Sequence, residues 1–75
     1  MSATEVLDAK GLNCPLPILH ARKKLNGMSS GDVLEIHATD PGAVADFQAF
    51  CRQTGNELLE SSQDGDVYKF QIKRS

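Results

Sequence analysis

The spacing of the apolar residues changes from segment to segment along this chain, and this change restricts its fold more than any other feature. In residues 18–28 and 43–54, apolar side chains recur every three or four positions, as they do on one face of a helix. In residues 34–38 and 68–72, every second side chain is apolar, which is typical of a strand with one covered face. The chain therefore combines helices with a sheet that they cover on one side.

The first helix is predicted to run from Pro15 to about Asn26. A proline is tolerated in the first turn of a helix, where its missing N–H removes no intrahelical hydrogen bond. Gly27 is predicted to end the helix at its C-terminal side. The stripe that would face the core consists of Ile18, Ala21, Leu25 and Met28.

The second helix is predicted between Asp40 and Gly55. Asp40 is a suitable N-cap, Pro41 would occupy the first helical position, and Gly55 would end the helix. The side chains that share its apolar face are Ala43, Val44, Phe47, Phe50, Cys51 and Thr54.

Four strands complete the predicted fold. They are expected at Val6–Ala9, Val33–Ala38, Leu58–Leu59 and Val67–Lys73. Residues 63–66 join the last two as a hairpin, because the Asp-Gly pair within them accepts positive φ angles. The element order βαβαββ predicts an α+β fold, a two-layer α/β sandwich with a four-stranded mixed sheet and both helices on one face. With 75 residues, we expect one domain spanning residues 1–75.

The charge of the chain excludes a general attraction to polyanions. Eight Lys and Arg residues against ten Asp and Glu residues leave a net charge of −2, so we expect no direct contact with nucleic acid. No apolar run approaches the roughly 18 residues of a membrane span, and residues 1–5 lack the features of a signal peptide. We therefore expect a soluble cytoplasmic protein without membrane contact.

The cysteines and histidines do not form a pattern that indicates a metal or a disulfide scaffold. Cys14 and Cys51 are too few for a secreted disulfide framework, and they are not spaced as a CxxC pair. His20 and His37 match no zinc-binding spacing with each other or with the cysteines. We therefore predict no metal and no cofactor.

The segment around Cys14 is the strongest candidate for chemistry. Cys14 precedes Pro15, which favours an extended backbone, so we expect Cys14 to be the N-cap of the first helix. The helix dipole at this position favours a thiolate over a thiol and predicts a lowered pKa. Because Pro15 and Pro17 lack an N–H, only the amides of Leu16 and Ile18 would be left to point at the sulfur. The alternative is that Cys14 is a small, inert apolar residue.

The outer face of the first helix is the candidate docking surface. Leu16 and Leu19 lie off the apolar stripe, so we expect them to be exposed beside Cys14 and to contact a partner. The basic residues of this helix are His20, Arg22, Lys23 and Lys24. They are either a solvated face or a cationic patch that meets an acidic partner or a tRNA phosphate.

Three other residues have simpler interpretations. Cys51 is predicted to be a buried structural residue beside Phe47 and Phe50. His37 is expected on the open face of the sheet, and Asp40 is expected to cap the second helix.

Taken together, these motifs resemble the TusA/SirA family of small sulfur carriers. The matching segments are Leu7-Asp8 through Gly11-Leu12-Asn13-Cys14-Pro15-Leu16-Pro17, Met28 to Gly31-Asp32, Asp40-Pro41, and Asp46-Phe47 through Phe50-Cys51. The resemblance implies a two-layer βαβαββ fold and a Cys14 that accepts sulfane sulfur as a persulfide, framed by Gly11, Pro15 and Pro17. Some family members have an acidic residue where this chain has Leu16.

The resemblance also implies partners and pathways. The sulfur donor would be a cysteine desulfurase or a rhodanese, and the acceptor a protein of the DsrE/TusD type. The pathway would be tRNA thiolation, molybdenum cofactor synthesis or sulfur oxidation. The chain would act as a sulfurtransferase-type carrier, a stoichiometric relay. We expect a monomer, and from the residues themselves we expect Leu16, Leu19, Arg22 and Lys23 to dock the partner. Two alternatives stay open: a thiol redox regulator, which requires a disulfide between Cys14 and Cys51, and an interaction module in which Cys14 is incidental.

Overall fold

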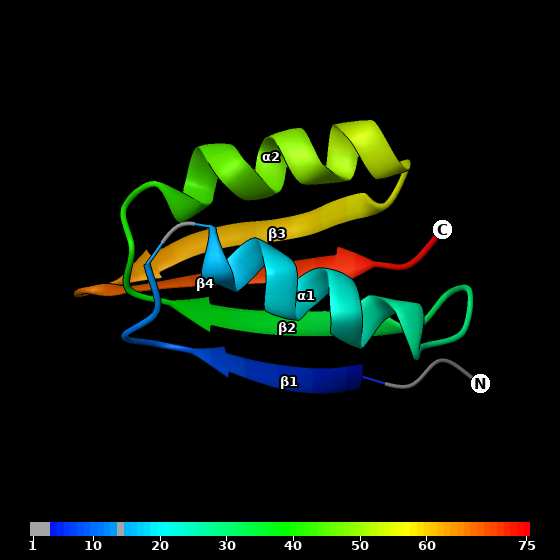
Figure 1. The fold of residues 1–75 in the computed structure, drawn as a ribbon, viewed down its shortest axis with the longest axis horizontal. Helices are drawn as coiled ribbons and strands as arrows, with labels where there is room; N and C mark the ends of the chain where they lie inside the picture. Colours follow the sequence, from blue (N-terminus) through cyan, green and yellow to red (C-terminus); the bar gives the residue numbers. More distant parts are fainter. Residues whose placement is uncertain (1–3, 14) are drawn as a thin grey trace.

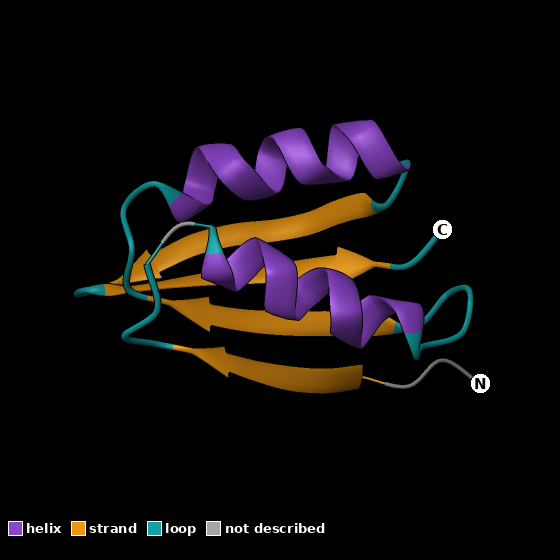
Figure 2. Cartoon of the chain, in the orientation of Figure 1, coloured by secondary structure: helices purple, strands orange, loops and turns teal. Residues whose placement is uncertain are grey.

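The computed structural model describes residues 4–13 and 15–75 and confirms the predicted element order (Figures 1 and 2). The elements are β1 (Thr4–Ala9), α1 (Leu16–Asn26), β2 (Val33–Ala38), α2 (Ala43–Thr54), β3 (Glu57–Asp64) and β4 (Val67–Lys73). The strands form one sheet in the order β1-β2-β4-β3. The β1–β2 pair is parallel, whereas β4 pairs with β2 and β3 in antiparallel orientation, so the sheet is mixed as predicted.

Both helices pack on the same face of this sheet (Figure 1). The alternation predicted for β2 is confirmed, because Leu34, Ile36 and Ala38 are all fully buried beneath the helices. Phe47 of α2 lies at the centre of the core, with its ring centroid 4.8 Å from that of Phe70 in β4. The hydrophobic core cluster consists of Ala9, Ala21, Leu25, Met28, Leu34, Ile36, Ala38, Ala43, Phe47, Phe50, Cys51, Phe70 and Ile72.

Strands β1 and β3 are longer than their side chains predict. β1 begins at Thr4 because its parallel pairing with β2 already starts there, opposite Val33. β3 extends over eight residues, not two, although only Leu58 among them packs against the core. It is an edge strand that pairs with β4 through its backbone, so its exposed side chains need no apolar alternation.

The second helix begins two residues later than predicted, with Gly42 as its N-cap. The carboxylate of Asp40 accepts a hydrogen bond from the Gly42 amide at 3.1 Å, and its carbonyl accepts one from Ala43 at 3.0 Å. Asp40 therefore closes a turn before α2 instead of capping the helix, because its side chain bonds the amide two residues on. Thr54 was predicted on the apolar face of this helix, but it is exposed at the end of α2. Its hydroxyl donates to the Phe50 carbonyl at 2.8 Å.

Candidate functional site

The candidate site lies where the two parallel strands end. β1 and β2 run in the same direction, so the loops that follow them lie at one edge of the sheet, on the left in Figure 1. The first loop leads into α1, and the Gly11–Pro17 motif runs from this loop into the first turn of the helix. The second loop, residues 39–42, leads into α2.

A tight turn opens the first loop. The Leu12 amide donates to the Ala9 carbonyl at 3.2 Å, and Gly11 occupies the third position of this turn with a φ of 82°. A side chain at Gly11 would meet no atom within 4 Å, so glycine is required here by its backbone conformation and not by space. The Gly11 amide donates a hydrogen bond to the hydroxyl oxygen of Thr39 in the second loop, at 2.9 Å.

Cys14 itself lies outside the described residues, and its neighbours show how α1 begins. The N-cap of α1 is Pro15, with φ −97° and ψ 17°, so the prediction that Cys14 would be the N-cap is wrong by one position. The Leu16 amide donates to the Asn13 carbonyl at 2.8 Å. This amide is therefore used by the preceding chain, and the expectation that it would be left for the sulfur is also wrong.

The two prolines of the motif have different surroundings. Pro15 is exposed, whereas Pro17 is buried on the face of α1 that also buries Ala21 and Leu25. Ile18, predicted as part of the core stripe, is only partly buried at its edge. Pro17 takes the core position because it lies four residues, about one helical turn, before Ala21.

The predicted exposure of the two leucines is confirmed. Leu16 is 42% exposed and Leu19 is 50% exposed, and together with His20 and Lys23 they line a shallow depression of about 260 Å³. Lys24 forms an ion pair with Glu5 of β1, with 2.9 Å between Nζ and Oε1. The Arg22 guanidinium lies 5.8 Å from the centre of the Phe50 ring, so this cation is held against α2.

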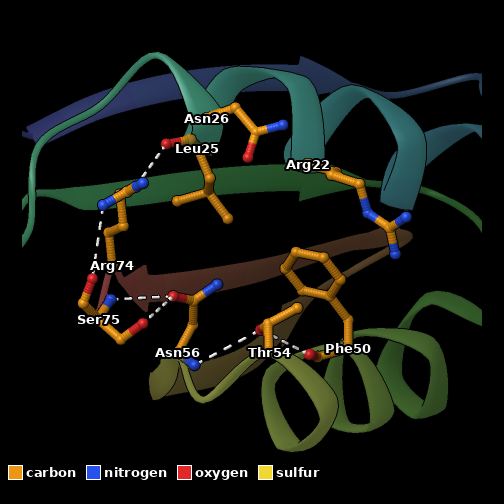
Figure 3. A pocket seen from close by; sticks show the side chains of 8 residues that line it. All are labelled: Arg22, Leu25, Asn26, Phe50, Thr54, Asn56, Arg74 and Ser75. Carbon is orange, nitrogen blue, oxygen red and sulfur yellow. Dashed lines mark hydrogen bonds between the residues drawn. The ribbon is translucent and has the colours of Figure 1, made fainter.

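A groove between the two helices begins beside the motif. It has a volume of about 200 Å³ and is lined by Pro15, Ile18, Arg22, Asp46, Ala49, Phe50 and Gln53. Arg22 and Phe50 also line a second pocket of about 250 Å³ further along α1, shown in Figure 3. There Arg74 donates from Nε to the Leu25 carbonyl at 2.8 Å and covers the end of α1. Sequence spacing could not predict these grooves, because the residues that line them come from separate elements.

Comparison with known proteins decides the family. The family described as "Sulfurtransferase TusA" matches residues 5–74 of this chain. The chain belongs to the TusA family of sulfur carrier proteins.

Individual relatives agree with this assignment. The chain is 65% identical to the sulfur carrier protein TusA of Allochromatium vinosum, over 92% of this chain and 91% of that protein. It is 36% identical to the sulfur carrier protein TusA of Pseudomonas aeruginosa, over 97% of this chain and 92% of that protein. A crystal structure of a SirA-like protein from Desulfitobacterium hafniense has the same fold, with a TM-score of 0.80, 24% identity, and coverage of 92% of this chain and 95% of that one.

The second cysteine of this TusA-family chain is part of the core, as predicted. Cys51 is 6% exposed on the inner face of α2, where burial raises the pKa of its thiol. A raised pKa reduces the thiolate fraction, which is the reactive form of cysteine. Burial and a neutral thiol make Cys51 a poor nucleophile in the folded chain.

His37 lies on the open face of the sheet, as predicted, and is only partly exposed. Its Nε2 lies 2.7 Å from a carboxylate oxygen of Glu35, and the other oxygen of Glu35 accepts a hydrogen bond from Gln71 at 3.2 Å. The hydrogen bond from His37, and to a smaller extent the one from Gln71, lowers the pKa of Glu35. This polar cluster is on the face of the sheet that the helices do not cover, because Glu35 and His37 alternate with the buried Leu34, Ile36 and Ala38.

Neither a candidate metal site nor a membrane-spanning helix occurs in residues 4–13 and 15–75. These residues contain no group of three or more His, Cys, Asp or Glu side chains that could hold a metal ion. Neither α1 nor α2 is long and apolar enough to cross a membrane.

Proposed function

We propose that this chain carries sulfur on Cys14, accepting sulfane sulfur as a persulfide and passing it to a thiol of a partner protein. The observation that carries the proposal is the family match across residues 5–74, which contain two cysteines, one of them buried in α2. Cys51 is unsuited to the reaction because it is in the core. Cys14 lies in the motif between Asn13 and Pro15, both of which are exposed.

The reaction is a pair of thiol exchanges that needs no cofactor. The Cys14 thiolate attacks the outer sulfur of a donor persulfide, a new S–S bond forms on Cys14, and the donor thiolate leaves. An acceptor thiolate then attacks the outer sulfur of the Cys14 persulfide, and Cys14 leaves as a thiolate. No external oxidant or reductant is consumed. The N-terminus of α1 favours the anionic forms of both the thiol and the persulfide.

The surface around the motif supports transfer between proteins. Leu16 and Leu19 are exposed apolar side chains one helical turn apart, and Arg22 and Lys23 add positive charge to the same helix. We infer that these four residues dock the donor, a cysteine desulfurase or a rhodanese, and the acceptor, a protein of the DsrE/TusD type. The relay would operate in the cytoplasm, in tRNA thiolation, molybdenum cofactor synthesis or sulfur oxidation.

Sulfur loading by a cysteine desulfurase in the presence of cysteine tests the proposal. The variants are Cys14→Ser and Cys51→Ala, and intact-mass spectrometry measures the gain of one sulfur atom. We expect loading of the native chain and of Cys51→Ala, and none of Cys14→Ser. Loading of Cys14→Ser would refute the proposal. A disulfide between Cys14 and Cys51 under mild oxidation would favour a redox regulator instead.

A further inference from the structure

Gly11, in the loop that contains Cys14, is hydrogen-bonded to a residue 28 positions further along the chain. The amide of Gly11 donates to the hydroxyl oxygen of Thr39 at 2.9 Å. The neighbouring amides form only local bonds, since Lys10 donates to the Asp8 carboxylate and Leu12 to the Ala9 carbonyl. The Gly11–Thr39 bond thus joins the β1–α1 loop to the end of β2.

We propose that Thr39 is a positioning residue for sulfur transfer, whose hydroxyl oxygen fixes the loop that carries Cys14. This inference rests on the proposed role of Cys14 as the sulfur acceptor. Thr39 does not react, and it acts on Cys14 only through Gly11 and the residues that follow it.

The geometry of the turn makes the Gly11 amide available for this bond. In the turn from Ala9 to Leu12, the closing hydrogen bond uses the Leu12 amide, so the Gly11 amide stays outside the turn. The φ of 82° at Gly11 is the angle that the third position of a type II turn requires. A turn of this kind therefore presents a backbone donor, and Thr39 supplies the acceptor.

Thr39 is itself held on both sides. It follows Ala38, the last residue of β2, which is fully buried. It precedes Asp40, whose side chain and carbonyl close the turn into α2. A hydroxyl fixed between a buried strand end and a hydrogen-bonded turn is a suitable anchor for a loop.

The remaining described part of the motif is anchored by other means. Leu12 packs against the core, and the Asn13 carbonyl accepts the Leu16 amide from α1. The described residues on either side of Cys14 are thus connected to β2, to the core and to α1. Of these three anchors, the bond to Thr39 is the one that a single side-chain substitution removes without changing the core.

The test compares Thr39→Val, which removes the acceptor at nearly constant shape, with Thr39→Ser, which keeps it. Thr54→Val is the control, because the Thr54 hydroxyl also hydrogen-bonds the backbone, at the far end of α2. It donates to the Phe50 carbonyl at 2.8 Å and accepts from the Asn56 amide at 3.5 Å. The measurements are amide hydrogen exchange at Gly11, the rate of Cys14 alkylation by iodoacetamide, the rate of sulfur loading, and thermal unfolding.

We expect faster exchange at Gly11 in Thr39→Val, and a loading rate that falls on the order of tenfold, as loss of orientation between two proteins does. Alkylation should also become slower, because a Cys14 held less firmly near the N-terminus of α1 has a smaller thiolate fraction. Thr39→Ser should restore both rates to within about twofold of the native chain, since its hydroxyl keeps the bond. Thr54→Val should lower the melting temperature about as much as Thr39→Val, by roughly 4–8 °C, and leave both rates unchanged.

Native rates in Thr39→Val despite faster Gly11 exchange would overturn the proposal. Equal losses in Thr39→Val and Thr54→Val would also overturn it, because they would show a general effect of stability. Failure of the proposed function has a different signature, in which the native chain does not load sulfur on Cys14. Gly11 exchange and Cys14 alkylation still test the role of Thr39 in that case, since neither depends on sulfur loading.

Discussion

The two helices cover the same face of the sheet but use their apolar residues in different ways. α2 places Phe47 and Phe50 in the core, where they are 0% and 4% exposed and their rings meet edge to face. α1 buries smaller side chains such as Pro17 and Ala21 and leaves two large ones, Leu16 and Leu19, partly in solvent.

If α1 docks a partner as proposed, this difference places stability mainly in one helix and recognition in the other. Complete burial of a leucine stabilises a fold by about 1.5–3 kcal/mol, and the two exposed leucines of α1 give up much of that stabilisation. α2 contributes Phe47 and Phe50, two of the three buried aromatic side chains, whereas α1 presents exposed leucines next to the motif. Substitutions in the two helices should therefore have opposite effects on stability and on sulfur transfer.

The largest effect on stability is expected for Phe47→Ala in α2. The ring is fully buried against Phe70 and Phe50, so its removal should cost about 3–5 kcal/mol of the free energy of unfolding. That is a large part of the roughly 5–15 kcal/mol that a domain has in total. Urea denaturation followed by circular dichroism measures the loss.

Leu19→Ala is the matched variant on α1. It also shortens a large apolar side chain in the middle of a helix, but that side chain is 50% exposed. The free energy of unfolding should stay within about 0.5 kcal/mol of the native value. A loss comparable to that of Phe47→Ala would show that the two helices do not differ in this way.

A smaller loss is expected for Cys51→Ser. The hydroxyl would enter the apolar face that buries Phe47 and Phe50, at a cost of about 1–3 kcal/mol if it finds no hydrogen-bond partner. Cys51→Ala avoids the buried hydroxyl and is the control. Because burial raises the pKa of Cys51, iodoacetamide at neutral pH should label Cys14 faster than Cys51 in the native chain. Equal labelling rates would contradict both the buried role of Cys51 and the reactive role of Cys14.

The third prediction concerns the C-terminal ends of the helices, each of which is followed by glycine. Gly55 after α2 has a φ of 78°, in the left-handed region, whereas Gly27 after α1 has a φ of −90°. Gly55→Ala should therefore cost about 1 kcal/mol, and thermal unfolding should detect it. Gly27→Ala should be neutral or slightly stabilising, since its nearest atom would be the Lys24 carbonyl oxygen at an ordinary 3.6 Å. A reversed order would mean that backbone conformation does not decide how the helices end.

These comparisons also show which parts of the structure can be predicted from the sequence. The strands with apolar alternation, β2 and β4, were predictable because one face of each is buried. β3 was recognisable only at Leu58-Leu59, because an edge strand is held mainly by backbone bonds that leave no side-chain pattern. Asp40 could cap a helix or close a turn, and the local sequence permits both.

The candidate site, like the fold, can be predicted only in part from the sequence. The motif around Cys14 and the exposure of Leu16 and Leu19 follow from local spacing, since helical periodicity alone places both leucines off the core stripe. The hydrogen bond from Gly11 to Thr39 joins residues 28 positions apart, and no periodicity connects them. Packing of the two loops at one edge of the sheet creates that contact, so it becomes visible only in three dimensions.

The smallest effect on stability is expected for Leu16→Glu, the substitution that tests the surface role of α1 most directly. Leu16 is the first residue of the helix and is 42% exposed, so little burial is lost. The first turn of α1 contains no acidic residue, and a carboxylate there interacts favourably with the helix dipole. The melting temperature should stay nearly unchanged or rise slightly.

Transfer of sulfur to or from a protein partner should nevertheless become slower in Leu16→Glu, because the apolar contact around Cys14 is replaced by a charge. The added charge should also raise the pKa of Cys14, so loading by a small-molecule persulfide is measured at a pH where the thiolate is fully formed. Leu19→Glu places the same charge one turn further along α1, at a second exposed leucine. If the leucines dock a partner, both variants keep small-molecule loading and lose protein-to-protein transfer. If loading and transfer fall together, and more in Leu16→Glu than in Leu19→Glu, the charge acts on the chemistry of Cys14 and the docking role of these leucines is wrong.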